Sequence, residues 1–234
     1  SGAVTIADAT NLDYETTASY TLTIVAYDAT SSDVESITIS ITNVNDAPTL
    51  ATAQADASTA EDSLYTLDVS GNFADADSGD TLSYSATGMP TTMTMTTAGV
   101  LSGTPLNADV GAHTVVVTAT DGTASVTDTF VVTVTNTNDA PTLATAQADA
   151  STAEDALYTL DVSGNFADVD VGDSLSYTAT GMPSTMTMST AGVLSGTPVN
   201  ADVGAHTVVV TATDGTASVT DTFVVTVTNT NDAP

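Results

Sequence analysis

The chain has 234 residues, of which 29 are Asp or Glu and none is Lys or Arg, so its formal net charge at pH 7 is −29. Binding to nucleic acid or to an anionic membrane surface depends on Lys and Arg, so this composition excludes both kinds of partner. Hydrophobic residues make up 41% of the chain and charged residues only 12%, which suits packed cores and does not fit a disordered acidic tail.

The carboxylates have no basic side chains to pair with, apart from a protonated His or the N-terminus. Clustered carboxylates must therefore be spread apart, protonated, or neutralised by cations. The chain has no Cys, which excludes disulfides and thiolate metal sites. No apolar run approaches the ~20 residues of a membrane span. We expect a soluble extracellular protein, at a cell surface or secreted, with no membrane insertion.

Residues 1–44 are predicted to be the C-terminal half of a β-sandwich module. A short strand is expected at Val4–Ile6, and apolar residues with a period of two predict further strands at Tyr20–Ala26 and Ile37–Ile41. About three strands do not make a sandwich that folds alone. Either the chain is cropped from a longer one, or strands of another chain complete this module.

The motif Asn45-Asp46-Ala47-Pro48 follows this segment and returns, 93 residues later each time, at 138–141 and 231–234. Proline cannot donate a ladder hydrogen bond, so each copy is predicted to mark a junction between modules. The boundaries that follow are a repeat at 45–137, a second repeat at 138–230 and the start of a further linker at 231–234. The two repeats differ at only eight positions, which indicates a structural array.

Each repeat is predicted to be an all-β sandwich. The strand candidates of the first repeat are Leu50–Ala57, Tyr65–Val69, Leu82–Ala86, Met93–Met95, Gly99–Leu101, Val115–Ala119 and Phe130–Val134. No segment has a convincing helical period. About seven short strands separated by Gly, Pro and Asp turns are typical of an immunoglobulin-like antiparallel sandwich. Two such sandwiches and the half module are expected to lie end to end as a rod.

Acidic residues gather outside the predicted strands. In the first repeat they are Glu61-Asp62, the run Asp75-Ala76-Asp77-Ser78-Gly79-Asp80, and Asp121-Gly122. The second repeat has Glu154-Asp155, then Asp168, Asp170 and Asp173, then Asp214-Gly215. Ca²⁺ takes 6–8 oxygen ligands from carboxylates and carbonyls, and alternating Asp residues in a turn supply them. The alternative is that Asp and Gly simply favour hairpin turns.

These residues resemble a known family. Leu12-Asp13-Tyr14-Glu15, Ala26-Tyr27-Asp28 and Asn43-Val44-Asn45-Asp46-Ala47-Pro48 are similar to the C-terminal half of a cadherin repeat. The complete repeats resemble the dystroglycan-type cadherin-like repeats of large bacterial surface proteins. The segments that carry this likeness are Phe73-Ala-Asp-Ala-Asp77, Gly99-Val-Leu-Ser-Gly-Thr-Pro105, Ala119-Thr-Asp-Gly122 and the linker motif.

The resemblance implies calcium ions at the joints between modules. The implied ligands of the first joint are Asp13, Glu15, Asn43, Asn45, Asp46, Asp75, Asp77 and Asp121. Those of the second are Glu61, Asn136, Asn138, Asp139, Asp168, Asp170 and Asp214. In the repeat that precedes the second joint, Leu101-Ser102-Gly103-Thr104 replaces the Leu-Asp-Tyr-Glu carboxylates. We therefore expect fewer or weaker ions at the second joint than at the first.

The sequence offers little for catalysis. His113 and His206 are the same position in two repeats, each at the start of a predicted strand, where a surface or strand-edge role is typical. There is no Cys and no second His in a repeat, and no Gly-x-Ser-x-Gly motif. Met89, Met93 and Met95 are expected to pack in the core. We predict that the chain is not an enzyme.

The function that these observations favour is a calcium-stiffened segment of an extracellular bacterial adhesin or surface fibre, acting as a spacer in cell adhesion. Its partners would be neighbouring repeats or identical chains, with a cell-surface or polysaccharide ligand held by other regions. Two alternatives stay open. The chain could be a filament subunit whose incomplete first module accepts a strand from a neighbour, or a module that itself binds polysaccharide.

Overall fold

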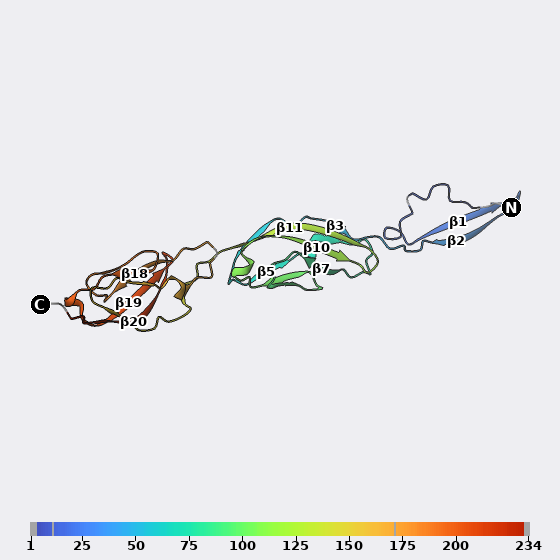
Figure 1. The fold of residues 1–234 in the computed structure, drawn as a ribbon. Helices are drawn as coiled ribbons and strands as arrows, with labels where there is room; N and C mark the ends of the chain where they lie inside the picture. The colour runs from blue at the N-terminus through green and yellow to red at the C-terminus, as the bar shows by residue number, and fades with distance from the viewer. Residues whose placement is uncertain (1–3, 11, 171, 232–234) are drawn as a thin grey trace. The chain divides into compact units, whose positions relative to one another are not determined.

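The computed structural model describes residues 4–10, 12–170 and 172–231, and these residues form two compact units, 1–135 and 136–234. The described chain is all-β with a few single turns of 3₁₀ helix (Figure 1). The third copy of the linker motif lies outside the described residues from Asp232 onward.

Unit 1 begins with a β-hairpin of two strands, β1 (Ser19–Tyr27) and β2 (Ser32–Ser40), which pair antiparallel. Both were predicted from their alternating apolar residues. The expected strand at Val4–Ile6 is wrong, because these residues make no strand ladder and Val4 and Ile6 are exposed. Residues with an alternating apolar pattern form a strand only where a neighbouring strand pairs with them.

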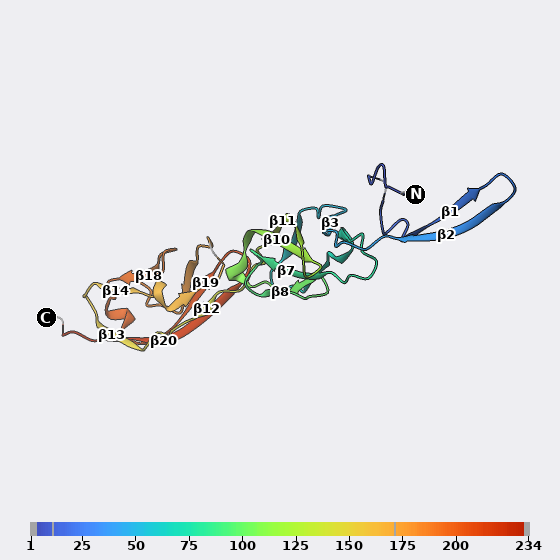
Figure 2. The same ribbon diagram turned by 90° about the vertical axis from the view of Figure 1, so that its right-hand side faces the viewer.

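The rest of unit 1 is a sandwich built from nine strands. They are β3 (Thr49–Leu50), β4 (Ala57–Ala60), β5 (Tyr65–Asp68), β6 (Phe73–Ala74), β7 (Ser83–Thr87), β8 (Met93–Met95), β9 (Val100–Gly103), β10 (Gly111–Thr120) and β11 (Ser125–Thr135). One sheet has the order β4-β11-β10-β7, the second has the order β5-β9-β8, and β3 pairs with β6 (Figures 1 and 2). The predicted strand Leu50–Ala57 is instead two short strands, β3 and β4, and β6 was not predicted, so the sandwich has nine strands in place of seven.

One pairing departs from the predicted antiparallel pattern. Strand β4 runs parallel to β11. The two ends of this pairing are fixed by hydrogen bonds from the Val131 N–H to Asp56 Oδ1, at 2.8 Å, and from the Glu61 N–H to the Thr135 carbonyl, at 3.0 Å.

Unit 2 repeats this sandwich strand by strand. Its strands are β12 (Thr142–Leu143), β13 (Ala150–Ala153), β14 (Tyr158–Asp161), β15 (Phe166–Ala167), β16 (Ser176–Thr180), β17 (Met186–Met188), β18 (Val193–Gly196), β19 (Gly204–Thr213) and β20 (Ser218–Thr228). The sheets are β13-β20-β19-β16, β14-β18-β17 and β12-β15.

The core of each unit lies between its two larger sheets. In unit 1 the inward row of β10 is Val115, Val117 and Ala119, none of them exposed, and Leu101 of the opposite sheet is equally buried. Met93 is buried, and Met89 and Met95 pack against the same cluster, which confirms the predicted core role of these methionines. Alternate residues of β10 and β11 are Thr and face outward, as the period of two requires.

The β1–β2 hairpin has the same register as the β10–β11 hairpin. Leu22 lies opposite Ile37 in one, and Val115 lies opposite Phe130 in the other. Val115 and Phe130 are 0% and 2% exposed, whereas Leu22 and Ile37 are 39% and 43% exposed. The hairpin therefore has the apolar row of a sandwich sheet without an opposite sheet over it.

Candidate metal centre

The candidate site of unit 1 is the loop between β6 and β7. Phe73 is buried in the core and fixes the start of the loop. The Asp77 N–H donates to Asp75 Oδ1 at 2.9 Å, and the Asp80 N–H donates to the Asp77 carbonyl at 3.0 Å. These bonds turn the backbone so that oxygens of Asp75, Asp77 and Asp80 all lie within 4.8 Å of one another.

The linker after β2 binds directly to this loop. Asn43 Nδ2 donates to Asp77 Oδ1 at 2.8 Å, and the Asp46 N–H donates to Asp77 Oδ2 at 2.7 Å. Asn45 Nδ2 donates to Asp121 Oδ2 at 3.1 Å, although Asp121 lies 76 residues further along the chain. The structure thus brings together the linker and loop residues that were predicted to form the first joint.

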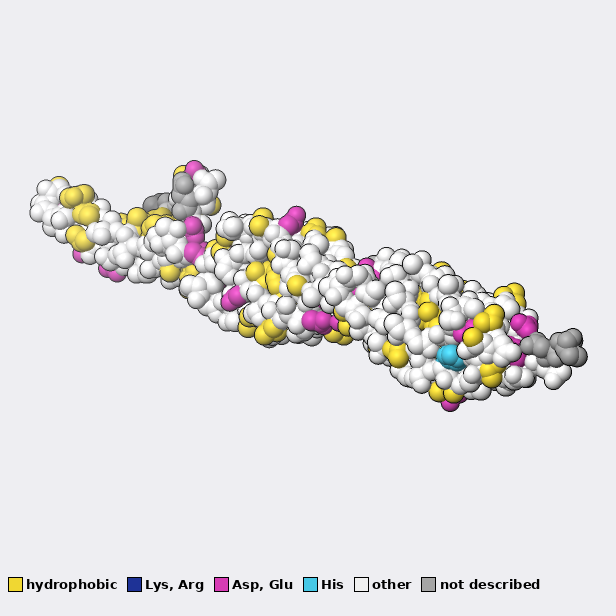
Figure 3. Space-filling view, turned by 90° about the vertical axis from the view of Figure 1, so that its left-hand side faces the viewer, with side chains coloured by type: hydrophobic (Ala, Val, Ile, Leu, Met, Phe, Trp, Pro, Cys, Tyr) yellow, Lys and Arg dark blue, Asp and Glu magenta, His cyan; other side chains and the backbone are white. Residues whose placement is uncertain are grey.

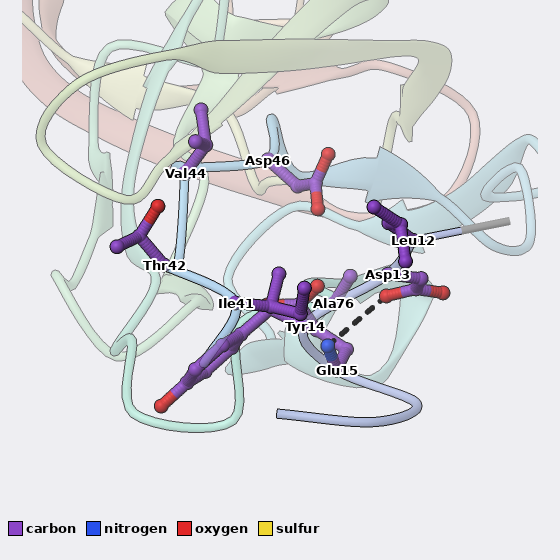
Figure 4. Close-up of a pocket in the computed structure, with 9 residues that line it drawn as sticks. All are labelled: Leu12, Asp13, Tyr14, Glu15, Ile41, Thr42, Val44, Asp46 and Ala76. Atoms are coloured by element: carbon purple, nitrogen blue, oxygen red, sulfur yellow. Dashed lines mark hydrogen bonds between the residues drawn. The ribbon is translucent and has the colours of Figure 1, made fainter. Parts of the chain in front are cut away.

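Glu15 lies close to Asp46 and Asp77. Its carboxylate forms a second group of three with Asp46 and Asp77, again with ligand atoms within 4.8 Å of one another. Figure 4 shows Asp13 and Glu15 from the segment before β1, and Asp46 from the linker, around a pocket of about 400 Å³. Of the eight residues predicted for the first joint, four belong to these groups. Asp13, Asn43 and Asn45 hydrogen-bond directly to members of the groups, and Asp121 accepts from Asn45.

Asp13 lies next to these groups and supports one of their members. Its Oδ1 accepts the Glu15 N–H at 3.0 Å, and its Oδ2 accepts the Thr16 hydroxyl at 2.8 Å. The pKa of Asp13 is lowered, first by the Thr16 hydroxyl and then by Glu15. Asp13 therefore holds the turn that presents Glu15 and is not one of the grouped carboxylates.

The carboxylates of the loop are electrostatically unequal. The Asp46 N–H and the Asn43 amide lower the pKa of Asp77, and the N–H groups of Ala124 and Thr123 lower that of Asp121. The pKa of Asp80 is raised by desolvation and then by the charges of Asp77, Asp75 and Asp121. No Lys or Arg exists to offset this repulsion.

The pKa of Glu15 is raised for similar reasons. Its own N–H acts to lower the value, but desolvation and the neighbouring carboxylates of Asp13 and Asp77 outweigh that effect. A bound cation would reverse this balance, since it stabilises each ionised form.

The donor set fits calcium. Asp75 Oδ2 is buried and accepts no hydrogen bond from the protein, and a buried ionised oxygen without a partner is costly. Ca²⁺ binds oxygen at 2.3–2.6 Å, so two ligand atoms on one ion can be up to about 5 Å apart. Oxygens that lie within 4.8 Å of one another meet this limit. Carboxylate and amide oxygens are also the ligand type that this ion prefers.

Unit 2 has the same loop between β15 and β16. Asn138 Nδ2 donates to Asp214 Oδ2 at 3.1 Å, and the Asp139 N–H donates to Asp170 Oδ2 at 2.7 Å. Oxygens of Asp168, Asp170 and Asp173 lie within 4.8 Å of one another. Asn136 makes no hydrogen bond to Asp170 within the described residues, unlike Asn43 in unit 1. Five of the seven residues predicted for the second joint therefore lie together in this unit.

Glu61, the remaining residue predicted for the second joint, is in unit 1 and is 1% exposed at the end of β4. Its copy Glu154 is 2% exposed, and Glu154 Oε1 accepts the Thr230 N–H at 2.7 Å. Each glutamate is thus buried beside the last residues of its own repeat. Asp80 and Asp173 belong to the predicted acidic loops but were not predicted as ligands. A local backbone turn brings each of them close to the other two carboxylates of its loop, and the sequence does not specify that turn.

The two histidines lie away from these loops. His113 Nε2 contacts the Asp109 carbonyl oxygen at 2.6 Å, and His206 makes the same contact with Asp202 at 2.7 Å. The Asp109 carboxylate accepts the Thr91 N–H and the hydroxyls of Thr91 and Thr92. Burial acts to raise the pKa of Asp109, but these donors prevail and lower it to about 2. This network joins the β7–β8 connection to the start of β10.

The comparison with protein families decides the assignment. The model described as "Putative Ig domain" matches residues 47–135 and again residues 140–228. The chain belongs to this immunoglobulin-domain family. Ig-like repeats of this kind are typically extracellular and structural rather than catalytic. No curated protein matches the chain.

Solved structures agree with the fold. The chain is similar to the extracellular cadherin domains 1–5 of protocadherin gamma B2, with 20% identity, a TM-score of 0.53, and coverage of 94% of this chain and 48% of that one. Mouse protocadherin-24 EC1–3 has 16% identity, a TM-score of 0.53, and coverage of 93% and 81%. A family 107 endo-fucoidan hydrolase has 26% identity but a TM-score of only 0.38, and this chain spans 34% of it.

Among the described residues, none of the helices is long and apolar enough to cross a bilayer. Figure 3 shows one face of the Ig-family protein, where Asp and Glu form small separate patches on a largely uncharged surface and no Lys or Arg is visible. The acidic loops are therefore local concentrations of charge.

Proposed function

We propose that this chain is a calcium-stiffened spacer segment of a bacterial surface adhesin, built from dystroglycan-type cadherin-like repeats. The observation that carries the proposal is the meeting of Asn43 and Asp46 from the linker, and Glu15 from the preceding segment, at the single carboxylate of Asp77. Two segments of the chain thus converge on one acidic loop, and the chain has no Lys or Arg to pair with it.

The ion would act by linking these segments. Glu15 and Asp46 lie before the sandwich, and Asp75, Asp77 and Asp121 lie within it. A cation held by both groups binds the ordered linker and not the disordered one, so it stabilises order by RT ln(1 + [Ca²⁺]/Kd). Calcium then fixes the direction in which one module follows the last, and tandem duplication adds length.

The linker motif, the cadherin-like half module and the absence of basic residues support the finer assignment to an extracellular bacterial fibre. In this role the repeats separate a binding region from the cell, and the adhesive ligand is held elsewhere in the protein. The chain spans about half of the protocadherin gamma B2 structure, whose title describes extracellular cadherin domains. The partners of these repeats would be further repeats of the same kind.

Thermal unfolding of the intact chain tests this proposal. We would compare millimolar Ca²⁺, the same concentration of Mg²⁺, and excess chelator, all at matched ionic strength. Calcium should raise the melting temperature well beyond magnesium, because Mg²⁺ demands near-octahedral geometry and sheds its water reluctantly. Equal melting temperatures in the three solutions would mean that the acidic loops are ordinary turns.

A second function is favoured by the hairpin β1–β2. Its apolar row is exposed at Leu22 and Ile37, and its outer edges have no paired strand among the described residues. In the complete units the corresponding hairpin is paired by β7 on one edge and β4 on the other. A strand from an identical chain would fill such an edge and make a filament. Polymers in sedimentation analysis would support this function, and a monomer would count against it.

The aromatic side chains in the core of the first complete repeat do not support the polysaccharide-binding alternative. Phe73, Tyr84 and Phe130 are buried, and the rings of Phe73 and Tyr84 pack together at 5.7 Å between centroids. These aromatic side chains belong to the core and do not form an exposed platform for sugars.

A further inference from the structure

Three apolar side chains are exposed at the end of the unit 1 sandwich where β11 ends. Leu64 is 76% exposed, Leu106 51% and Val110 38%, and no other large apolar side chain of residues 45–137 is exposed. Asp62 lies beside them and is exposed as well. We propose that these four residues, which we call the end surface, bind a partner protein that presents an apolar surface with a Lys or Arg side chain at its edge. Such a binding role goes beyond that of a spacer.

Backbone pairing brings two segments of the end surface together. The β5–β9 ladder begins at Tyr65, directly after Leu64. Strand β9 leads to Pro105, whose carbonyl accepts the Asp62 N–H at 2.8 Å. Leu106 is the next residue after Pro105. The segment that carries Asp62 and Leu64 therefore lies along the segment that carries Leu106.

A single turn of 3₁₀ helix places Val110 at the same end of the unit. The Asp109 N–H donates to the Leu106 carbonyl at 2.7 Å. The Val110 N–H donates to the Asn107 carbonyl at 3.2 Å. The Asp109 carboxylate fixes this turn, because it accepts the Leu106 N–H at 3.3 Å and the Thr91 N–H at 2.7 Å. The end surface is thus held in place before a partner binds, which lowers the entropy cost of binding.

Asp62 has a left-handed backbone conformation, with φ at 57°. Its counterpart Asp155 has φ at 60°, and among the residues that the structure describes only glycines share a positive φ with these two. Glycine takes this conformation without strain, yet both repeats have aspartate there. The Asp62 carboxylate is exposed and accepts no hydrogen bond from a described residue, so the fold does not need it. Strain of this kind is concentrated at binding and other functional sites.

Charge decides what kind of partner fits the end surface. Asp62 places a negative charge beside apolar side chains, and the chain has no Lys or Arg, so a second copy cannot supply one. Arg is enriched at protein interfaces, where its apolar stem packs against the surface and its guanidinium pairs with a carboxylate. The partner is therefore a basic protein surface rather than another copy of this chain.

Unit 2 repeats the end surface with Asp155, Leu157, Val199 and Val203. Its three apolar side chains are 76%, 40% and 40% exposed. Four side chains cover less than the about 800 Å² per partner that a standard complex buries, so one end surface alone binds weakly. A partner with two basic sites engages both end surfaces of one chain, and this linkage raises the overall affinity.

Selection of short peptides on the intact chain tests this proposal. A phage library of random peptides would be selected on the wild type in millimolar Ca²⁺, which neutralises the acidic loops. We expect enriched peptides that combine Arg or Lys with Leu, Phe or Trp. Their affinity should fall about tenfold for the apolar double variant, Leu64→Ser/Leu157→Ser. It should also fall for the acidic double variant, Asp62→Asn/Asp155→Asn, in which Asn keeps the left-handed backbone.

Two matched controls change exposed side chains of the β1–β2 hairpin instead. Tyr27→Ser/Val34→Ser removes apolar groups, Asp33→Asn/Glu35→Gln removes charge, and both should leave the affinity unchanged. All these positions are exposed, so every variant should melt like the wild type. Peptides that bind the wild type and the apolar double variant equally would overturn the end surface, as would a selection that yields no binder. An equal loss in the charge control and the acidic double variant would also overturn it, because attraction to net charge would then suffice.

Discussion

Asp77 and Asp170 occupy the same position in two nearly identical loops, yet their surroundings differ. Asp77 accepts hydrogen bonds on both oxygens, from Asn43 Nδ2 and from the Asp46 N–H, and Glu15 approaches it. Asp170 accepts only the Asp139 N–H and keeps a buried unpartnered Oδ1. The loops themselves have the same internal hydrogen bonds.

The difference shows that the loop alone does not determine the environment of its central carboxylate. The half module supplies Leu12-Asp13-Tyr14-Glu15, which the complete repeat replaces with Leu101-Ser102-Gly103-Thr104. Asp77 thus has the carboxylate of Glu15 near it, and the group around Asp170 contains no counterpart of Glu15.

The largest expected effect comes from Asp77→Asn, because Asp77 belongs to both groups of three in unit 1. Loss of a shared ligand should weaken calcium binding there by at least about 100-fold, since even outer-shell changes cost 10–100-fold in metal sites. Isothermal titration calorimetry measures this loss. Asp170→Asn should weaken calcium binding in unit 2 only. If each variant weakened binding equally in both units, the two loops would not act as separate sites.

Asp109→Asn should cost about 2 kcal/mol of unfolding free energy, because it replaces an acceptor oxygen with an amide NH2 donor that faces the N–H and hydroxyl donors of Thr91 and Thr92. Asp202 has the same partners in unit 2, so Asp202→Asn should act in the same direction. Neither change should alter the shift caused by calcium. Hydrogen exchange of peptides that contain Thr91 or Ser184 reports each unit separately, since these positions differ between the repeats.

The lowered pKa of Asp109 predicts that the folded chain loses stability in acid. The pKa of Asp109 is about 2 in the folded chain against an ordinary value of 3.8. A lowered folded pKa contributes stability that is present above pH 3.8 and is lost as the pH falls toward 2. Chemical denaturation in chelator between pH 5 and pH 2 should show this loss, and Asp109→Asn should flatten it. An unchanged slope in the variant would contradict the assignment.

Glu15→Gln should weaken calcium binding in unit 1 by about tenfold and leave unit 2 unaffected, because only the first linker has this carboxylate. Glu35→Gln is the control: it removes the same charge from an exposed site on β2. Calorimetric titration of both variants gives the comparison. If Glu35→Gln weakened binding as much as Glu15→Gln, net charge rather than ligation would explain the effect.

The smallest effect is expected for Asn43→Ala, which gives Asp77 the hydrogen-bonding state of Asp170. Loss of this one amide should cost about 1 kcal/mol in chelator. Asn136→Ala should be near neutral, since Asn136 has no bond to Asp170 among the described residues. Denaturant melts of the two variants would decide, and equal losses would show that the hydrogen bond from Asn43 to Asp77 is not what distinguishes the loops.

The period-two patterns were sufficient to predict the long strands, because rows such as Val115, Val117 and Ala119 can only alternate as a half-buried strand does. The 93-residue interval placed the linkers. Val4–Ile6 failed because a local pattern does not report whether a partner strand exists. The parallel pairing of β4 with β11 was missed for the same reason, since strand direction depends on contacts 75 residues apart.

The candidate site was predicted as a set of residues but not as a geometry. The family resemblance placed Asn43, Asn45, Asp77 and Asp121 in one joint, and in the structure Asn43 donates to Asp77 and Asn45 donates to Asp121. The role of Asp13 as a turn cap and the return of Asp80 to the cluster depend on local backbone turns, which the order of residues does not specify.

The most direct test of the account measures how calcium orders the linker of unit 1. The chain has no Cys, so Thr38→Cys on β2 and Thr129→Cys on β11 would carry the only two spin labels. Pulsed electron spin resonance then gives the distribution of distances between them. The account predicts a narrow distribution in Ca²⁺ and a broad one in chelator. Distributions of equal width in both would contradict it.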